Sequence, residues 1–387
     1  MGRDTPNAIA RAEATARDRG VRLRPLNDSN PTRHGLGPSE LPGVYEADPR
    51  GSLAARRELA RFLTDSGRGG EGVVDPDHLY LLDSTSEAYA WLFMLLCDPG
   101  DAVLAPVPGY PLVDSLARLV GVGVLDYRLR YDGSWTVDMA DIRRILESPE
   151  GGRIRALVLI NPDNPTGSYV HPEERAAVID LCRRHGLALI ADEVFFGYPL
   201  EPLRGRRRLA GEEAVLTFAL DGLSKSLAAP HAKVGWIRVS GPEDQVAEAL
   251  RLLDRIADDF LPVSACVAED LPRLLAAVEG RTGAVLDRIG DNLRRLEAIL
   301  ASRPRCPVSL MRPEGGWSVV LRIPSVIDED SLVLRLISQK AMTDQPGYFF
   351  DMPGSGYLVL SLLPEPTDFV EGATAVLDLV DAMLEGR

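Results

Sequence analysis

The sequence predicts an α/β protein with a mostly parallel sheet in three layers, together with a smaller α+β domain. Short apolar segments alternate with helical patterns along the chain, as in proteins made of successive strand–helix–strand units. Several of the apolar segments also lack the polar alternation of a half-buried strand. We therefore expect helices to cover both faces of the sheet.

The apolar segments expected to form strands of the large sheet cover residues 78–82, 102–106, 154–160, 187–191, 215–220 and 236–240. Helical patterns lie between them, for example at residues 173–185 and 245–256. Together these segments account for a large domain that we place at residues 46–280.

A long helical stretch at residues 281–301 marks the start of the smaller domain. Two short apolar segments, 319–321 and 357–362, follow it and are expected to be strands. We expect residues 281–387, completed by the N-terminal segment 1–45, to form this small α+β domain.

Composition and charge exclude several classes of function. The chain has 387 residues, of which 45% are hydrophobic and 26% charged, and a net charge of -14 that disfavours nucleic acid or an anionic membrane as a partner. No segment has the pattern of a signal peptide or a membrane span. The four cysteines are scattered without metal-type spacing, so we expect free thiols, no metal site and a cytoplasmic location. The basic run at 204–208 is expected to be a solvated loop.

Three polar residues, Asn164, Asp192 and Lys225, follow the ends of three expected strands, where open α/β sheets place their chemistry. Each has an ordinary explanation if taken alone. Asn164 lies in a turn that needs no ligand, Asp192 would cap the next helix, and a lone Lys225 would more often be a solvated loop residue. Because the three occur in this order at successive strand ends, chance is a poor explanation for all of them together.

On these residues the chain resembles the class I/II aminotransferases, fold type I enzymes that use pyridoxal 5′-phosphate (PLP), over nearly its whole length. The resemblance implies an aspartate aminotransferase-like fold with a PLP-binding large domain. Lys225 resembles the lysine that forms a Schiff base with PLP, and Ser224 beside it resembles a cofactor contact. A buried, ionised Asp192 would keep the pyridine nitrogen protonated, which PLP needs to act as an electron sink. Asn164 would direct its amide at the phenol oxygen of the cofactor.

Further landmarks of the family follow in sequence order. Ser84, Thr85 and Ser86 resemble the segment that opens a helix onto the cofactor phosphate, because amides in a first helical turn lack internal partners and favour an anion. Tyr110 resembles the aromatic ring that stacks on the pyridine. Trp317 follows two glycines in a segment that resembles a small-domain signature, and we expect it at the substrate.

Four positions depart from the family's pattern. Phe195 stands where a tyrosine usually donates to the cofactor phenolate, so the proton near that oxygen should be held more tightly. Lys233 replaces a phosphate-binding arginine, which keeps the charge but loses the bidentate fork. Gly222 replaces a serine that often contacts the phosphate. Val359 stands where the family has the arginine that binds the substrate α-carboxylate.

Two residues of the N-terminal segment are also expected at the site. Tyr45 resembles the tyrosine that reaches the cofactor phosphate of the partner subunit, so the resemblance implies a homodimer with shared active sites. Arg33 is our candidate replacement for the missing carboxylate-binding arginine. An exposed loop arginine with no such role is an equally simple interpretation of Arg33.

The sequence thus predicts a PLP-dependent aminotransferase that acts on a small amino donor and a 2-oxo acid. The first alternative keeps the cofactor and changes the reaction: the departures at Phe195 and Val359 would also suit a lyase, cyclase, decarboxylase or oxidase of specialised metabolism. The second alternative is a PLP-binding domain used in regulation or ligand sensing, which the acidic balance of the chain disfavours.

Overall fold

The computed structural model describes residues 8–23 and 28–386 of the chain. The chain forms two compact units, Met1–Glu46 and Ala47–Arg387. The N-terminal unit holds α1 (Ala8–Asp18) and a 3₁₀ turn, η1 (Pro31–His34).

A hydrogen-bonded loop surrounds η1 in the N-terminal unit. Asn30 caps the turn by accepting a hydrogen bond from the Thr32 amide at 3.1 Å, and its side-chain amide donates to the Tyr45 carbonyl at 2.8 Å. The Arg33 guanidinium lies 3.7 Å from the Asp28 carboxylate, and its side chain is half exposed. The loop thus presents Arg33 as a charged surface residue of its own unit.

The second unit is built on an eight-stranded sheet with the order β1-β8-β7-β6-β5-β2-β3-β4. Its strands are β1 (Leu79–Leu82), β2 (Ala102–Val107), β3 (Gly123–Tyr131), β4 (Trp135–Val137), β5 (Ile154–Ile160), β6 (Ala188–Asp192), β7 (Thr217–Gly222) and β8 (Gly235–Ser240). Neighbours from β7 to β3 are parallel, whereas β8 and β4 run in the opposite direction. The predicted mostly parallel sheet is confirmed.

The sequence did not predict β3 and β4, which pair as an antiparallel hairpin at one edge of this sheet. Side chains of β3 alternate in its second half between buried and exposed positions, and several of the exposed ones are charged. An edge hairpin of this kind lacks the continuous apolar run by which the inner strands were recognised.

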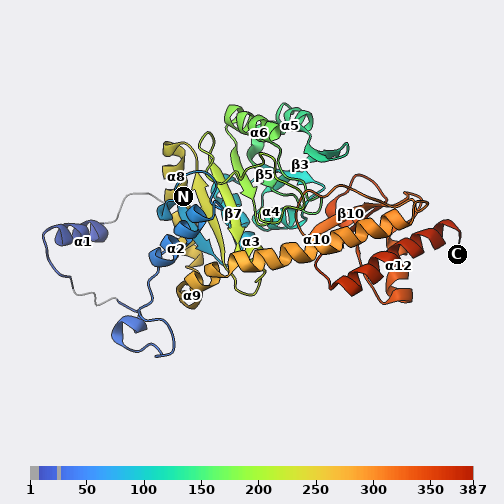
Figure 1. Ribbon diagram of the computed structural model, residues 1–387. Coiled ribbons are helices and arrows are strands. Elements are labelled where there is room, and N and C mark those ends of the chain that lie inside the picture. The colour runs from blue at the N-terminus through green and yellow to red at the C-terminus, as the bar shows by residue number, and fades with distance from the viewer. Residues whose placement is uncertain (1–7, 24–27, 387) are drawn as a thin grey trace. The chain divides into compact units, whose positions relative to one another are not determined.

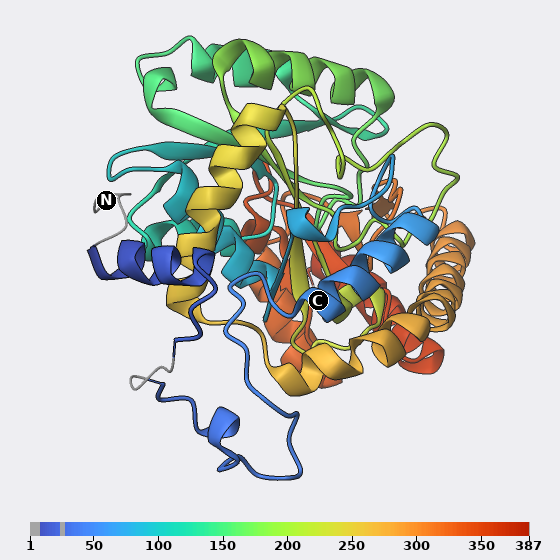
Figure 2. The ribbon, with the colours of Figure 1, turned by 90° about the vertical axis from the view of Figure 1, so that its left-hand side faces the viewer.

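Helices cover both faces of the large sheet, as Figures 1 and 2 show. One face packs against α3 (Thr85–Leu96), α4 (Leu112–Leu119) and α8 (Glu243–Phe260), and the other against α5 (Met139–Leu146) and α6 (Pro172–His185). Buried apolar side chains of the strands and helices fill both spaces between the layers. The predicted three-layer α/β arrangement is therefore confirmed.

Shorter elements and two further helices complete this part of the unit. The helices α2 (Leu53–Asp65) and α9 (Ala265–Ala276) pack together beside β1 and β8. The short elements are η2 (Pro76–His78), η3 (Gly151–Arg153) and α7 (Leu223–Ser226). The last of these carries Lys225.

A second, antiparallel sheet has the strand order β11-β12-β10-β9. Its strands are β9 (Ser309–Leu310), β10 (Ser318–Arg322), β11 (Gln345–Pro346) and β12 (Tyr357–Ser361). The helical elements with it are α10 (Val278–Ser302), α11 (Glu329–Arg335), the π-helical turn η4 (Leu336–Lys340), η5 (Gly347–Phe350) and α12 (Pro366–Leu384). In Figure 1, α10 runs from α9 to this sheet, where α12 packs against it.

The basic run at residues 204–208 is only partly solvated, so that expectation was wrong for two of its arginines. Arg206 pairs with the buried Glu314. Arg208 is buried and lies 3.3 Å from the Asp221 carboxylate. Their long side chains reach carboxylates that are far away in the sequence, which the sequence could not reveal.

Within residues 8–23 and 28–386, no helix is both long and apolar enough to cross a membrane. The same part of the chain holds no cluster of three or more His, Cys, Asp or Glu side chains suited to a metal ion.

Candidate active site

The three strand-end residues lie at one edge of the large sheet. The strands β5, β6 and β7 are adjacent and parallel, and Asp192, the last residue of β6, is level with Ile160 of β5 and Leu220 of β7. Asn164 lies in the turn just beyond β5, and Lys225 lies on α7 just beyond β7. Parallel strands all end at the same edge, so the register alone brings these side chains to one region.

Asp192 is a buried carboxylate with two hydrogen-bond donors. Its Oδ2 accepts a hydrogen bond from the Tyr89 hydroxyl at 3.0 Å, and its Oδ1 accepts one from the Val194 amide at 3.2 Å. Burial raises the pKa of Asp192 to about 6, against these two hydrogen bonds, which lower it. The two hydrogen bonds favour the ionised carboxylate, and a cation beside it would favour that charge further.

The Lys225 amine lies beside a pair of aromatic rings that pack against each other. Its Nζ lies 5.3 Å from the centre of the Phe195 ring and 5.2 Å from that of Trp317. Burial lowers the pKa of Lys225, while the negative charge of Asp192 acts in the opposite direction. A lysine in this setting exchanges its proton closer to neutral pH than a solvated lysine does.

Phe195 lies beside Lys225. Its ring packs edge-to-face against Trp317, with centroids 5.4 Å apart, and it is almost fully buried. A ring at this place offers contact and exclusion of water but no hydrogen-bond donor.

The N-terminus of α3 opens at the same edge of the sheet. Ser84 caps the helix by accepting a hydrogen bond from the Glu87 amide at 3.2 Å, and Thr85 begins it. Gly235, the first residue of β8, packs closely on this helix start, since a Cβ there would lie 3.1 Å from the Ser84 carbonyl carbon. Ser86 belongs to the same first turn, so a group of partly free amides faces this edge.

The other residues predicted to contact the cofactor lie on two loops and on α7 at this end of the sheet. Lys233 is exposed, has a left-handed backbone with φ of 51°, and lies two residues before Gly235. Tyr110 follows β2 and its side chain is partly exposed, while Ser224 precedes Lys225 on α7.

The turn that carries Asn164 is held by buried polar contacts. Asn161 donates its side-chain amide to Glu193 at 3.0 Å. The Asp163 carboxylate accepts a hydrogen bond from the Thr166 hydroxyl at 2.7 Å. Both anchors flank Asn164, whose own side chain is half-buried.

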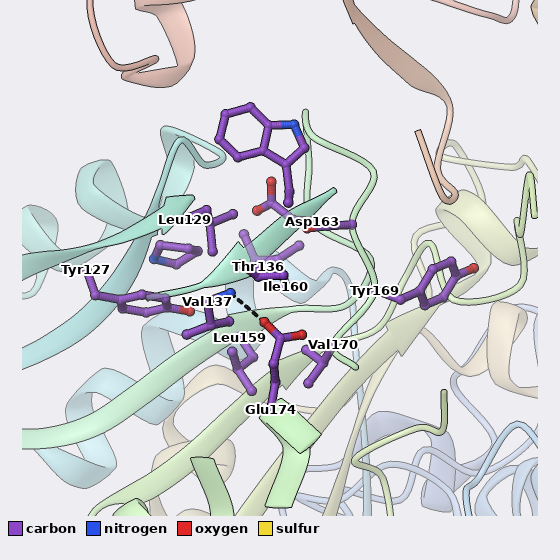
Figure 3. Close-up of a pocket in the computed structure, with 13 residues that line it drawn as sticks. Tyr127, Leu129, Thr136, Val137, Leu159, Ile160, Asp163, Tyr169, Val170 and Glu174 are labelled. Carbon is purple, nitrogen blue, oxygen red and sulfur yellow. Dashed lines mark hydrogen bonds between the residues drawn. The ribbon is translucent and has the colours of Figure 1, made fainter. Parts of the chain in front are cut away.

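A small cavity lies beneath this turn, and Figure 3 shows Asp163 and Glu174 on opposite sides of it. Its volume is about 10 Å³, which is room for roughly one water molecule and far too little for a cofactor. Burial raises the pKa of Asp163 to about 7. The cavity therefore belongs to the support of the turn and not to the space where a cofactor would bind.

Val359, at the position where the family has its carboxylate-binding arginine, is buried on β12. It is level with Val320 of β10 and belongs to an apolar cluster that also includes Phe350 and Met352. This position therefore offers no charge to a substrate. Arg33 and Tyr45 belong to the N-terminal unit, and their roles at the site stay predictions.

Sequence analysis missed two tyrosines. Tyr89 lies on the apolar face of α3 and binds Asp192, and Tyr198 donates a hydrogen bond to the Lys225 carbonyl. A hydroxyl among buried apolar side chains needs a partner, which was the available signal for Tyr89. No pattern in the sequence indicated the partner of Tyr198.

Comparisons with known proteins bear on this arrangement. A family model described as aminotransferase class I and II matches residues 46–365. An alanine aminotransferase of Mycobacterium tuberculosis is 28% identical over 368 residues, which is 90% of this chain and 83% of the relative. An S-alkyl-thiohydroximate lyase of Arabidopsis thaliana is 30% identical over 330 residues, or 81% and 67% of the two chains. The solved structure of an alanine aminotransferase from Pyrococcus furiosus matches the fold with a TM-score of 0.76 at 21% sequence identity. The match covers 99% of this chain and 98% of that chain.

The chain therefore belongs to the class I and II aminotransferase family. It is a PLP-dependent aminotransferase that moves an amino group between an amino acid and a 2-oxo acid.

The first prediction concerns Phe195. Replacing Phe195 by Tyr should lower the pH midpoint of the cofactor's visible absorbance, because a phenol there would donate to the ionised ring oxygen and favour proton loss beside it. The measurement is a spectrophotometric pH titration of the purified holoenzyme. Phe196→Tyr is the control, since the Phe196 ring packs against Tyr169 and Arg208 instead of Lys225. A midpoint that stays or rises in Phe195→Tyr would contradict the placement of residue 195 beside the ring oxygen.

Proposed function

We propose that Lys225 attaches the cofactor and moves the proton during amino transfer between a small amino acid and a 2-oxo acid. The observation that carries the proposal is the position of the half-buried Lys225 at the sheet edge that also holds Asp192, where partial burial lowers the pKa of the amine. A base works best when its pKa is close to the working pH, and the lowering of the Lys225 pKa acts in that direction.

The residues at this edge fit PLP. Bound PLP supplies an electron sink that stabilises negative charge at the substrate Cα. The Asp192 carboxylate offers the anion that holds a proton on a pyridine nitrogen, and Tyr89 and Val194 hold the carboxylate in place. The free amides at the start of α3 and the cation of Lys233 suit a phosphate.

The remaining roles concern orientation. Asn164 would contact the ring oxygen of the cofactor, Tyr110 would stack on its ring, and Ser224 would add a contact beside the lysine. Lys225, with Phe195 beside it, would take the proton from the substrate Cα and deliver it to the cofactor carbon. The rings of Phe195 and Trp317 beside the amine would limit the access of water to it during this transfer.

We infer a small amino donor from two lines of support. The relative from Mycobacterium tuberculosis is named alanine aminotransferase, and the one from Haemophilus influenzae glutamate-pyruvate aminotransferase. Trp317 and Phe195 are bulky and flank the lysine, which leaves limited room beside the reacting atoms. Trp317 would then contact the substrate.

The assembly belongs to the same proposal. Tyr45 would reach the cofactor phosphate of the partner subunit, so the working enzyme would be a homodimer with shared sites. We also propose a cytoplasmic location, in keeping with the scattered cysteines of the chain.

A lyase or another PLP reaction is the second candidate, and specific observations favour it. Phe195 removes a phenol donor, the buried Val359 removes the usual carboxylate cation, and one relative is named a lyase. Both changes remove a polar or charged group from the reacting centre. The charges around that centre influence which bond of the substrate breaks.

The second prediction separates these reactions. L-Alanine added alone to the holoenzyme should convert the cofactor to its amine form and release one equivalent of 2-oxo acid per site, because transamination has a first half that needs no acceptor. The measurement is the absorbance change together with the amount of 2-oxo acid. Lys225→Arg is the control and should show neither. A cofactor spectrum that returns unchanged, with repeated turnover of the donor, would instead indicate the lyase.

The third prediction concerns Arg33. If its guanidinium binds the substrate carboxylate, Arg33→Ala should lose a charge-assisted contact of about 2–4 kcal/mol, or roughly thirty- to a thousand-fold in kcat/KM. The cofactor spectrum should stay intact. Arg17→Ala, at an exposed arginine of the same unit, is the matched control. Near-full activity of Arg33→Ala would show that Arg33 is only a surface residue.

A further inference from the structure

We propose that Tyr198 is a positioning residue for Lys225. Its hydroxyl holds the main chain of Lys225, and its ring packs against Trp317, which lies beside the Lys225 amine. This inference rests on the role proposed for Lys225. Tyr198 was not among the residues expected at the site. Its proposed role, which is to position the lysine, differs from that of the tyrosine that the family has at position 195, which donates to the cofactor.

The first observation is the hydrogen bond of the Tyr198 hydroxyl to the Lys225 carbonyl. Lys225 lies on α7, a helix of only four residues, so most of its carbonyls lack partners within the helix. The same carbonyl also accepts a hydrogen bond from the Ala228 amide at 2.9 Å. Tyr198 therefore ties the lysine's own peptide group to the segment that follows β6.

The neighbouring carbonyl is held in the same way by a different element. Thr282 of α10 donates its hydroxyl to the Ser226 carbonyl at 2.8 Å, and Arg68 donates to the Thr282 hydroxyl at 3.1 Å. The two consecutive carbonyls at the end of α7 are thus each fixed by a side chain from another part of the chain. A short helix with such external partners has little freedom to shift.

The second observation is the packing of the Tyr198 ring. Its centroid lies 5.1 Å from that of Trp317, and the Trp317 ring lies 5.2 Å from the Lys225 Nζ. Trp317 lies in the loop before β10, and its ring packs against both Phe195 and Tyr198, so these two rings together set its position relative to α7. Tyr198, which is completely buried, is the one of the two that also donates a hydrogen bond to the Lys225 carbonyl.

The hydroxyl of Tyr198 is a reliable donor. Burial raises the pKa of Tyr198 to about 12, so the phenol keeps its proton throughout the range in which the enzyme works. A buried phenol with a carbonyl partner is also satisfied, so it stabilises the site instead of weakening it.

Fixing α7 in this way would also fix the distance from the Lys225 amine to the atoms between which it moves the proton. The amine has to approach the substrate Cα and the cofactor in turn, and a displacement of a fraction of an ångström slows proton transfer without preventing substrate binding. Loss of the Tyr198 hydroxyl should therefore act on kcat more than on KM.

The fourth prediction compares two matched variants. Tyr198→Phe should lower kcat by about tenfold with KM changed by less than about twofold, as expected for a small misplacement of the catalytic group. Tyr127→Phe is the control: Tyr127 is equally buried, and its hydroxyl donates to the Val158 carbonyl at 2.8 Å, in the middle of the sheet. This control should keep the kcat of the wild type. Thermal melting of both variants measures what each hydroxyl contributes to stability.

A second measurement needs no activity. The pH dependence of Lys225 acylation in the cofactor-free protein, followed by mass spectrometry, reports the pKa of its amine. Tyr198→Leu removes one of the two rings that hold Trp317 in place, so this pKa should rise towards that of a solvated lysine, whereas Tyr198→Phe keeps the ring and should change it less. A variant that fails to fold would be recognised by its melting curve, and Tyr198→Phe then carries the test.

Two results would overturn the inference: a kcat of Tyr198→Phe equal to that of Tyr127→Phe, or a Lys225 pKa that is the same in wild type, Tyr198→Phe and Tyr198→Leu. The Lys225→Arg variant separates this failure from failure of the proposed function. If Lys225→Arg retains the pH-dependent cofactor spectrum of the wild type, then Lys225 is not the cofactor's amine and the proposed function itself is wrong.

Discussion

The register of three adjacent parallel strands is the constraint on which the site depends. Because β5, β6 and β7 are paired side by side, whatever follows each strand must emerge at the same edge of the sheet. Asn164, Asp192 and Lys225 are far apart in the sequence and meet for this reason. A slip of one residue in β6 would turn Asp192 towards the opposite face and leave a buried carboxylate without its partners.

The opposite face of these strand ends carries a second set of polar residues that supports the first. Glu193 follows Asp192 and accepts hydrogen bonds from the Asn161 side chain at 3.0 Å and the Leu209 amide at 2.8 Å. Arg208 lies 3.6 Å from Glu193 and 3.3 Å from Asp221, which precedes α7. The turn, the carboxylate and the lysine are thereby joined to one buried ion network. Removing a single member would leave an uncompensated charge, so the network should hold the strand ends rigidly.

How much could be predicted from the sequence depended on what kind of signal each feature leaves. Continuous apolar runs identified the inner strands, and the order Asn, Asp, Lys at their ends predicted a candidate site, which the register of the strands brings to one edge of the sheet. The β3–β4 hairpin escaped because its exposed positions are polar, as expected at an edge. Tyr198 and Arg208 escaped because their partners are distant in sequence, and only the folded chain shows which carbonyl or carboxylate a side chain reaches. Phe195 and Val359 were recognised as departures only against the family's pattern.

The account depends most on the identity of the amine that holds the cofactor. Its most direct test is borohydride reduction of the purified holoenzyme, followed by proteolysis and mass mapping of the pyridoxyl group. The account predicts a single label on Lys225, the half-buried residue whose amine lies beside the rings of Phe195 and Trp317. A label on another lysine, such as Lys233, or a protein that carries no reducible cofactor, would contradict it.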